Sequence, residues 1–552
     1  MVSGGLDTGA LETRILPMGE RALLIETASL EHVLALRARL EASTPAGVLD
    51  IVPAARTVLV QLDRNVLGRA AATAWIETAA LAEVAAVSAD ADSRESAPTQ
   101  RSVRVARSHL LDISYDGPDL DEVARLLGMT PDALIAQHLA ARWTVAFTGF
   151  APGFGYLVSD EWSLDVPRRE SPRTSVPAGS VGVAGQFSGA YPRQTPGGWQ
   201  LIGTTAAPLF DALAADPALL APGDTVRFQQ RPVRQEREGA QSAELASSAA
   251  ASSAAATPRA RSFRIERAGL LATVQDFGRP GLASRGIAPS GALDRGALRT
   301  ANRLLGNPEG AAGIELTMGG FAAELLPSGA PGADAWIAIT GAAGAVTIDG
   351  RAVDQGAAVR WPVGSRLEID IPTLGVRPYL AVRGGVDAPL VAGSRSSDVM
   401  AGLGSAPLAA GDVVGIRDDA TLPIPANDLS PWSVPGGDIE VMLGAGPRAD
   451  WFEASALASL FDEPWLVTND SNRVGMRLAG PALARARGGE LPSEGMVVGA
   501  MQVPPSGQPT VLLADGPVTG GYPVIAVVAE ASLDRLAQAR PGQRVRFRHA
   551  QP

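Results

Sequence analysis

The segment Pro222-Gly-Asp-Thr-Val-Arg-Phe228 recurs near the end of the chain as Pro541-Gly-Gln-Arg-Val-Arg-Phe547. A second pair of strings, Thr195-Pro-Gly-Gly-Trp199 and Val518-Thr-Gly-Gly-Tyr522, precedes the first pair at similar distances. A weaker third copy, Ala409-Ala-Gly-Asp-Val-Val414, lies between them. Repetition on this scale predicts related β-barrel units that each end in a similar closing strand. Chance similarity between short glycine-rich turns is the alternative.

The rest of the chain is also typical of a β-rich protein. The sequence of 552 residues contains 61 glycines and 42 prolines, which suits many short strands and tight turns. Residues 12–90 alternate between strand-like and helix-like patterns and predict a small α+β domain. Residues 101–228, 263–430 and 431–547 predict three β-barrel domains. The expected fold class is therefore mainly β, with a small α+β domain at the N-terminus.

Four stretches have the spacing of apolar residues that predicts helices. They are residues 30–40, 68–87, 120–142 and 293–305. The third should break in two just before Pro131, because the residue before a proline disfavours the helical conformation.

Residues 229–262 predict a disordered linker between the two halves. The segment is rich in alanine and serine, and Val233 and Leu245 are its only large apolar residues. Such a segment cannot offset its ordering entropy by burial. We therefore expect a flexible tether, and a fusion of two ancestral chains would leave a seam of this kind.

Composition excludes several classes of protein. The net charge of −11 argues against a nucleic-acid or anionic-membrane partner, because both need a basic face. There is no basic segment followed by an apolar run at the N-terminus and no apolar run of about 18 residues, so we expect neither a signal peptide nor a membrane span. The absence of cysteine excludes disulfides and thiolate chemistry. A cytoplasmic protein is expected.

Lysine is also absent, and all 47 basic residues are arginine. Codon drift in a GC-rich genome is a sufficient cause. The chemical consequence is that this chain has no P-loop lysine, no lysine Schiff base and no attachment point for biotin.

His138 is the first candidate for chemistry. The four histidines show no His-x-x-x-His spacing, so a histidine metal site is not expected. His138 lies at the end of the helical insert, shortly before a Gly-Phe-Ala-Pro-Gly string, where it could act as a general base or contact a substrate. A buried structural histidine is the alternative.

Arginines and carboxylates gather in two further stretches. Arg168 and Arg173 lie in a proline-bounded segment and predict an anion site, with a solvated charged loop as the alternative. The second stretch combines Gln275, Asp276 and Arg279 around a glycine turn.

A predicted helix start and three polar loops complete the candidates. Asp294 and Arg295 begin a helix whose N-terminus could hold an anion, although the same residues could cap the helix. Arg395 lies in Gly393-Ser-Arg-Ser-Ser-Asp398, and Gln502, Asp515 and Tyr522 lie in glycine-bounded loops near the C-terminus. Ordinary solvated turns are the alternative for these loops.

The first half of the chain resembles the B subunit of bacterial ATP-dependent 5-oxoprolinase, a family also described as allophanate hydrolase subunit 1 and as Kip kinase inhibitors. The matching strings include Val52-Pro-Ala-Ala-Arg-Thr-Val-Leu-Val60, Tyr115-Asp-Gly-Pro-Asp-Leu120, Gly149-Phe-Ala-Pro-Gly-Phe154, Pro167-Arg-Arg, Val176-Pro-Ala-Gly-Ser-Val181 and Pro196-Gly-Gly-Trp199. Gly155 and Trp143 depart from this family, which often has proline and tyrosine there.

The second half resembles the C subunit, also called allophanate hydrolase subunit 2. The strings here are Val274-Gln-Asp-Phe-Gly-Arg-Pro-Gly281, Ser290-Gly-Ala-Leu-Asp294, Ala301-Asn-Arg-Leu-Leu-Gly-Asn-Pro308, Gly393-Ser-Arg-Ser-Ser-Asp398, Gln502-Val-Pro504 and Thr519-Gly-Gly-Tyr-Pro523. Nearly the whole chain except the linker is covered.

The resemblance implies cyclophilin-like β-barrels in both halves and ATP-dependent opening of 5-oxoproline to glutamate, with a separate A subunit as partner. ATP and Mg²⁺ enter only through this resemblance, and the oligomeric state stays open. We expect the catalytic groups to be His138, Asp276, Asp294 and Asp515. We expect the substrate- or phosphate-binding residues to be Arg168, Arg173, Gln275, Arg279, Arg295, Arg395, Gln502 and Tyr522.

Two other functions remain compatible with the same resemblance. The pair of subunits is also similar to the carboxyltransferase part of urea carboxylase, which would require a biotin carrier on another chain. A non-catalytic regulator of a histidine kinase is the third possibility. If the linker is the seam of a gene fusion, the active cleft is expected between the two halves.

Overall fold

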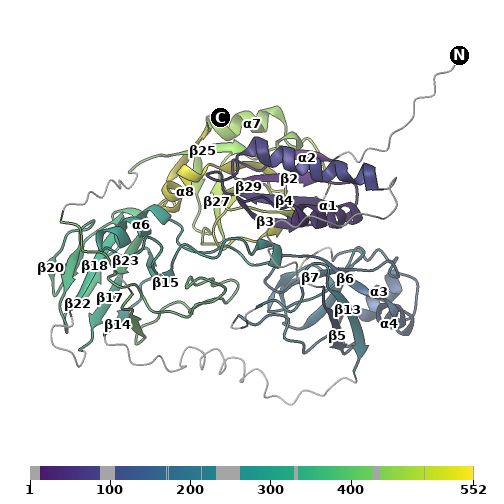
Figure 1. The fold of residues 1–552 in the computed structure, drawn as a ribbon, viewed down its shortest axis with the longest axis horizontal. Coiled ribbons are helices and arrows are strands. Elements are labelled where there is room, and N and C mark those ends of the chain that lie inside the picture. The colour runs from purple at the N-terminus through teal and green to yellow at the C-terminus, as the bar shows by residue number, and fades with distance from the viewer. Residues whose placement is uncertain are drawn as a thin grey trace.

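The computed structural model is mainly β in its regular structure, with many strands and few helices (Figure 1). The described residues are 13–86, 106–231, 261–327, 334–426 and 436–550, apart from the single positions 170, 172, 213, 215, 420 and 490. The predicted linker, 229–262, lies almost entirely outside the described residues. Strand β13 before it ends at Gln230, and strand β14 after it begins at Arg261. Among the described residues, no helix is long and apolar enough to cross a membrane.

The N-terminal domain is an antiparallel sheet in the order β1-β2-β4-β3 with two helices on one face. Its elements are β1 Arg14–Pro17, β2 Ala22–Glu26, α1 Leu30–Ala42, β3 Val48–Pro53, β4 Thr57–Leu62 and α2 Arg69–Ala86. Alternation along β2 directs Leu23 and Ile25 toward the helices and Leu24 to the other face. Leu24 belongs to a core that also contains Val524 and Val527 of the last domain. The first domain of the chain therefore rests on the last one.

The first barrel is a seven-stranded sheet in the order β12-β9-β10-β7-β6-β13-β5. Its elements are β5 Ser108–Ile113, α3 Leu120–Leu126, α4 Pro131–Ala140, β6 Trp143–Thr148, β7 Gly155–Val158, β9 Ser180–Ala184, β10 Phe187–Ala190, β12 Gln200–Thr204 and β13 Thr225–Gln230. Ser114 and Thr204 exchange two backbone hydrogen bonds of 2.8 Å and join the edge strands. The helical insert breaks before Pro131, as predicted.

The second barrel is closed, in the cyclic order β25-β32-β29-β30-β27-β26-β33. Its elements are β25 Ile439–Ala445, α7 Ala454–Asp462, β26 Trp465–Val467, β27 Gly475–Ala479, β29 Ala500–Gln502, β30 Thr510–Leu512, β32 Val524–Val528, α8 Glu530–Ala537 and β33 Arg544–His549. Helices α7 and α8 have no counterpart among the predicted helices, because eight or nine residues give little periodicity.

The two barrels have the same strand order, which confirms the predicted repeat. The quoted closing segments form β13 and β33. Each lies between one parallel and one antiparallel neighbour, β5 and β6 for β13 and β25 and β26 for β33. Trp143 and Trp465 occupy matching positions, since each donates its indole N–H to the carbonyl five residues earlier. β-Barrels in both halves are thus confirmed.

Each barrel also carries a separate two-stranded sheet that we call a clip. The first clip pairs β8 Arg173–Val176 with β11 Thr195–Gly197. The second clip pairs β28 Glu494–Gly495 with β31 Thr519–Gly520. The clips hold equivalent positions in the chain order of the two barrels.

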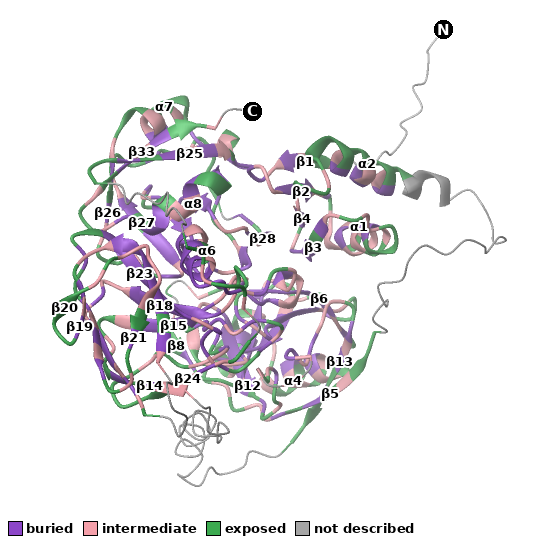
Figure 2. Cartoon of the chain, turned by 60° about the vertical axis from the view of Figure 1, so that its left-hand side comes forward, coloured by how far each residue is buried: buried purple, intermediate pink, exposed green. Residues whose placement is uncertain are grey.

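The middle domain consists of two sheets that share one core. Its elements are β14 Arg261–Arg267, β15 Leu271–Gln275, α6 Arg295–Leu304, β16 Gly313–Thr317, β17 Phe321–Leu325, β18 Ala335–Ala343, β19 Val346–Ile348, β20 Arg351–Ala352, β21 Val359–Trp361, β22 Arg366–Ile369, β23 Leu374–Val382 and β24 Val413–Ile416. The suggested third copy is wrong, because β24 is an edge strand whose sheet neighbour is the antiparallel β14. In Figure 2 the strands of this domain and of the barrels are largely buried, whereas the outer face of α2 is exposed.

Candidate functional site

A cleft of about 890 Å³ lies where the N-terminal domain, the middle domain and the second barrel meet. Its polar lining includes Arg21, Arg279, Ser290, Arg295 and Asp534. The N-terminal domain contributes its β1–β2 turn and the end of β4, and the second barrel contributes Met496–Val498 and helix α8. Two residues predicted from the sequence, Arg279 and Arg295, therefore face this cleft.

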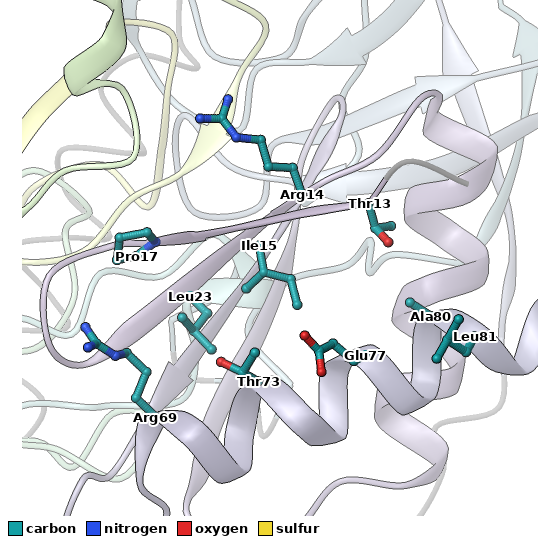
Figure 3. A pocket seen from close by; sticks show the side chains of 10 residues that line it. All are labelled: Thr13, Arg14, Ile15, Pro17, Leu23, Arg69, Thr73, Glu77, Ala80 and Leu81. Atoms are coloured by element: carbon teal, nitrogen blue, oxygen red, sulfur yellow. The ribbon is translucent and has the colours of Figure 1, made fainter. Parts of the chain in front are cut away.

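A second pocket of about 710 Å³ lies inside the N-terminal domain, between β1, β2 and α2 (Figure 3). Its charged lining residues are Arg14, Arg69 and Glu77. None of the predicted site residues reaches it. The candidate site is therefore the cleft between the domains.

Asp276 holds the polar loop 394–398 against the end of β15. Its carboxylate accepts hydrogen bonds from Ser394 Oγ at 2.6 Å, Ser396 Oγ at 2.5 Å, the Arg395 N–H at 2.6 Å and the Gly278 N–H at 2.7 Å. Both oxygens are thus occupied by the chain's own donors. In this structure Asp276 positions the loop rather than offering an open ligand position.

The turn beside Asp276 needs glycine at two positions. Gly278 and Gly291 both have positive φ, and a Cβ on Gly278 would lie 2.3 Å from the carbonyl oxygen of Pro289. Ser290 has φ +54° although it is not glycine, a conformation that costs of order 1 kcal/mol. Its hydroxyl donates to Asp515 at 2.7 Å, which places this strained residue against the second barrel.

Arg473 joins the second barrel to the middle domain. It donates to Asp515 at 2.8 and 3.0 Å, to Glu315 at 2.6 Å and to the carbonyl of Gly291 at 2.7 Å. Burial lowers the pKa of Arg473, but the charges of Asp515 and Glu315 raise it above its ordinary value overall. Burial raises the pKa of Glu315, and the charges of Arg473 and Arg377 more than reverse this. Asp515 is therefore part of a closed ion-pair network.

The N-terminus of α6 is occupied by carboxylates of the chain itself. Asp294 is the N-cap and accepts from the Ala297 N–H at 2.8 Å and from Gln538 Nε2 at 2.7 Å. Asp534 accepts from the N–H groups of Arg295 and Gly296. Burial, together with the charge of Asp534, raises the pKa of Asp294 well above its ordinary value. The geometry thus corresponds to the capping alternative.

Arg279 lines this cleft and has N–H donors without a partner in the described structure. Its side chain is buried and Nη2 donates to the carbonyl of Ser396, while Nε and Nη1 have no partner in the described part of the chain. Burial lowers its pKa, and the charges of Asp398, Asp276 and Asp515 oppose that effect. Leaving a buried donor unpaired costs about 1–3 kcal/mol, and more for a charged group. A bound oxyanion would remove this cost.

Arg193 of the first barrel reaches the segment that follows Asp398 in the middle domain. A Cβ on Gly402 would lie 3.2 Å from its Nη2, and its Nη1 is also buried without a partner among the described residues. The negative charge of Asp398 raises the pKa of both Arg193 and Arg279. Burial and then the charge of Asp515 raise the pKa of Asp398 to about 6.

We call Arg193, Arg279 and Asp398 the junction cluster. Each guanidinium group has unused N–H donors of the kind that bind a carboxylate or another oxyanion, and Arg279 also lines the cleft. A carboxyl group with a pKa near 6 can take up or release a proton near neutral pH. The cluster requires both halves, because Arg193 comes from the first barrel and the other two from the middle domain.

Further contacts fix the first barrel beside this cluster. The N–H of Phe150 donates to Thr519 Oγ1 of the second clip at 3.2 Å, and Thr148 Oγ1 donates to the carbonyl of Ser284 at 2.7 Å. Phe150 has φ +64°, so a second strained residue lies where the halves meet. The N–H of Ser284 in turn donates to Asp50 of the N-terminal domain.

His138 lies in the core of the first barrel, away from the cleft. It is fully buried, and its ring nitrogens bond to the hydroxyls of Tyr115 at 2.7 Å and Ser188 at 2.9 Å. Burial lowers its pKa to about 3, so the ring is neutral at physiological pH. This environment is that of a structural histidine and gives its predicted catalytic role no support.

The remaining predicted residues are dispersed. Gln275 is buried and donates to the carbonyl of Ser397, while Arg395 donates to the carbonyl of Ala388. Tyr522 is 45% exposed on the second barrel. Gln502 lies at the end of β29 in the same barrel.

Arg173 belongs to the first clip, where it pairs with Asp119 at 2.7 Å, and Arg168 lies in the segment that precedes this clip. Sequence reasoning missed Arg193, which no motif marks. Asp398 ends the Gly393–Asp398 motif, in which Arg395 was the predicted site residue.

The three aspartates expected to be catalytic all take part in internal contacts. The carboxylate oxygens of Asp276, Asp294 and Asp515 accept hydrogen bonds from donors of the chain itself. In the residues that the structure describes, no group of three or more His, Asp or Glu side chains is arranged to hold a metal ion.

Comparison with known proteins identifies the family. Residues 13–220 match the model for carboxyltransferase domain, subdomain C and D, and residues 285–549 match that for subdomain A and B. The crystal structure of TTHA0988 is 33% identical with a TM-score of 0.79, and the match covers 96% of this chain and 99% of that one.

Curated relatives match each half separately. The C subunit of 5-oxoprolinase from Escherichia coli is 38% identical over 51% of this chain and 90% of that protein. The B subunit of 5-oxoprolinase from Escherichia coli O157:H7 is 51% identical over 20% of this chain, and the match spans 51% of its length. Urea amidolyase of Lachancea kluyveri is 33% identical over 52% of this chain but only 17% of its own length. The chain therefore belongs to the carboxyltransferase-domain family, with the C and D subdomains preceding the A and B subdomains and relatives among the B and C subunits of 5-oxoprolinase.

Proposed function

We propose that this chain is the fused B–C component of a 5-oxoprolinase and opens 5-oxoproline to glutamate together with a separate A subunit and ATP. The observation that carries the proposal is the junction cluster, because its arginines come from the halves that match the B and C subunits. A site assembled across that boundary would require the two halves to act together.

The cluster suits a substrate with one carboxylate and one lactam. The unused N–H groups of Arg279 would hold the carboxylate in the cleft, and Arg193 would approach from the first barrel. Asp398 would exchange a proton with the lactam group, for which a pKa near 6 is appropriate. A five-membered lactam is a poor electrophile, and phosphorylation of its oxygen by ATP would supply the activation.

The test combines the purified chain with the A subunit from the same genome. We expect glutamate and ADP to form from 5-oxoproline and ATP only when both proteins are present. Absence of turnover at every Mg²⁺ concentration would contradict the proposal.

Arg279→Gln should lower kcat/KM about 10- to 100-fold, as loss of a charge-assisted contact does. Arg299→Gln is the matched control, because Arg299 lines the same cleft but is exposed and paired with Glu309. Equal losses in both variants would indicate that only the general positive charge of the cleft matters.

A carboxyltransferase is the second candidate, because the family models describe that activity and urea amidolyase is among the relatives. The chain has no lysine, so the biotin would be on another protein. Transfer of a labelled carboxyl group from a biotinylated carrier protein, blocked by avidin, would establish this function instead.

A further inference from the structure

One loop of the middle domain, residues 279–289, forms part of the wall of the cleft and carries Arg279 at its base. The two ends of this cleft loop are tied together, because the N–H of Arg279 donates to the carbonyl of Pro289 at 2.7 Å. Ser290 follows the loop and donates its N–H to the carbonyl of Ala514 at 2.9 Å. The backbone of the loop therefore sets the point from which the side chain of Arg279 enters the cleft.

The cleft loop has little structure of its own to hold it in one conformation. Its regular part is a single 3₁₀ turn, Ala283–Arg285. The bonds of this turn run from the Arg285 N–H to the carbonyl of Leu282 at 3.0 Å and from the Gly286 N–H to the carbonyl of Ala283 at 2.9 Å. One turn cannot offset the entropy of ordering such a segment, so contacts from outside the loop must hold it.

The N-terminal domain holds the tip of the cleft loop at Ser284. The Ser284 N–H donates to Asp50 Oδ2 at 3.0 Å, while Asp50 Oδ1 accepts from the N–H of Ile51 at 2.9 Å. Asp50 is buried, so water competes little for this bond. A Cβ on Gly281 would lie 3.0 Å from the carbonyl oxygen of Leu49, which shows how closely the loop approaches β3.

The first barrel holds the same residue by its carbonyl group. Thr148 Oγ1 at the end of β6 donates to the carbonyl of Ser284 at 2.7 Å, and Thr148 is also buried. The next residue, Arg285, pairs with Asp216 of this barrel at 3.2 Å. Ser284 is thus bound by two domains that both lie in the half matching subdomains C and D.

Apolar side chains of the cleft loop pack in two separate cores. Ala283 and Ala288 belong to the core that the N-terminal domain shares with the second barrel. Ile287 belongs to a small core of the middle domain, against which Phe210 of the first barrel packs. Apolar burial has no preferred direction, whereas hydrogen bonds do. The two bonds at Ser284 are therefore the contacts that orient the tip.

We propose that Asp50 and Thr148 are positioning residues for Arg279 and act on it through Ser284. The inference rests on the proposed function, in which Arg279 holds the carboxylate of the substrate. Neither Asp50 nor Thr148 lines the cleft, so an effect of either on turnover must pass through the loop. A contact to substrate works well only when the residues behind it fix its position. The half that precedes the linker thereby acts on the C-subunit-like side of the site.

The first kinetic test is Thr148→Val in the full chain, assayed with the A subunit. The variant keeps the shape of the side chain and removes the hydroxyl that binds Ser284. We expect KM for 5-oxoproline to rise about three- to tenfold and kcat to change less than about twofold, because a contact made in both the ground state and the transition state is weakened. Thr144→Val on the same strand is the matched control and should leave both constants unchanged. An equal rise in KM in both variants would overturn the proposal.

The second kinetic test compares two substitutions of Asp50. Asp50→Ala removes the acceptor of the Ser284 N–H and should raise KM about as much as Thr148→Val does, whereas Asp50→Asn keeps one acceptor oxygen and should raise it less. Val58→Ala is the control for lost stability, because Val58 is buried in the core beneath the helices of the same domain. A rise in KM in Val58→Ala as large as in Asp50→Ala would show that only the stability of the domain matters, and the proposal would fail.

Hydrogen exchange in the isolated full chain separates this inference from the proposed reaction, because it needs no turnover. Asp50→Ala and Thr148→Val should speed exchange of the Arg279 N–H about tenfold, together with that of Ser284, and leave Ala297 in α6 unchanged. Faster exchange confined to Ser284 would overturn the proposal, since the tip would then move without the base. Exchange that changes as expected in a chain without turnover would support the positioning and contradict the proposed function.

Discussion

The two barrels share a strand order, but the ion pair next to the clip has opposite polarity in the two. In the second barrel a buried arginine, Arg448, lies between Glu494 and Glu26. In the first barrel a buried aspartate, Asp119, lies among arginines whose side chains are 22 and 35% exposed. The difference shows that the same strand order accommodates an ion pair of either polarity. The second pair joins two domains, and the first faces solvent.

The largest expected effect comes from breaking the buried pair. Arg448→Met should lower the free energy of unfolding by about 3–5 kcal/mol, because Glu494 and Glu26 lose their shared cation. Hydrogen exchange in β25 and β33 measures this loss. Arg477→Met, at an exposed position of the same barrel, should cost less than about 1 kcal/mol. A similar small loss in Arg448→Met would show that the buried pair is not important for stability.

The next effect concerns the junction cluster, where the two halves meet. The pKa of Asp398 is raised to about 6 in the folded chain, so its ionisation opposes folding as the pH rises from about 4 to 6. Asp398→Asn should therefore stabilise the protein by roughly 2–3 kcal/mol at pH 8 and by nothing at pH 4. Thermal melts at both pH values measure this difference, and a gain that is independent of pH would contradict it.

Asp119→Asn should cost about 1–2 kcal/mol, less than the loss of Arg448, because the arginines it leaves unpaired can reach water. Hydrogen exchange in β12 measures the change, since the Leu201 N–H donates to this carboxylate at 2.7 Å. A cost equal to that of Arg448→Met would remove the distinction between the solvent-facing and the buried clip.

The smallest effect is expected from exchanging His138 for the residue at the matching position of the other barrel. Trp143 donates to the carbonyl of His138 and Trp465 to that of Leu460, which makes these two residues equivalent. His138→Leu should cost about 1 kcal/mol through the hydroxyls of Tyr115 and Ser188 that it leaves unpaired. Turnover per folded molecule should be unchanged. A large loss of turnover with normal stability would restore a catalytic role for this histidine.

Local signals in the sequence predicted the elements that depend on local physics. Pro131 marked the break between α3 and α4, and the recurring Pro-Gly segments marked β13 and β33. The third copy failed, because a Gly-Asp-Val turn also occurs before an edge strand.

Only part of the candidate site could be predicted, because its residues converge from distant parts of the chain. Arg279 was found through a polar glycine turn. Arg193 lies in an unremarkable string, and its relation to Asp398 exists only once the first barrel packs on the loop around Gly402. Likewise, no local feature distinguishes a buried His138 from an accessible one, since Ser188 and Tyr115 are remote in sequence.

The contact between the first and last domains has a consequence for synthesis of the protein on the ribosome. One face of the N-terminal sheet, with Leu24 and Leu59, is covered by strands of the second barrel. At roughly 5–20 residues per second, that face waits on the order of a minute for its partner to emerge. During this interval an apolar surface is open to other nascent chains. A chaperone that binds apolar segments should therefore be found on ribosomes that have translated the N-terminal domain but not yet the second barrel.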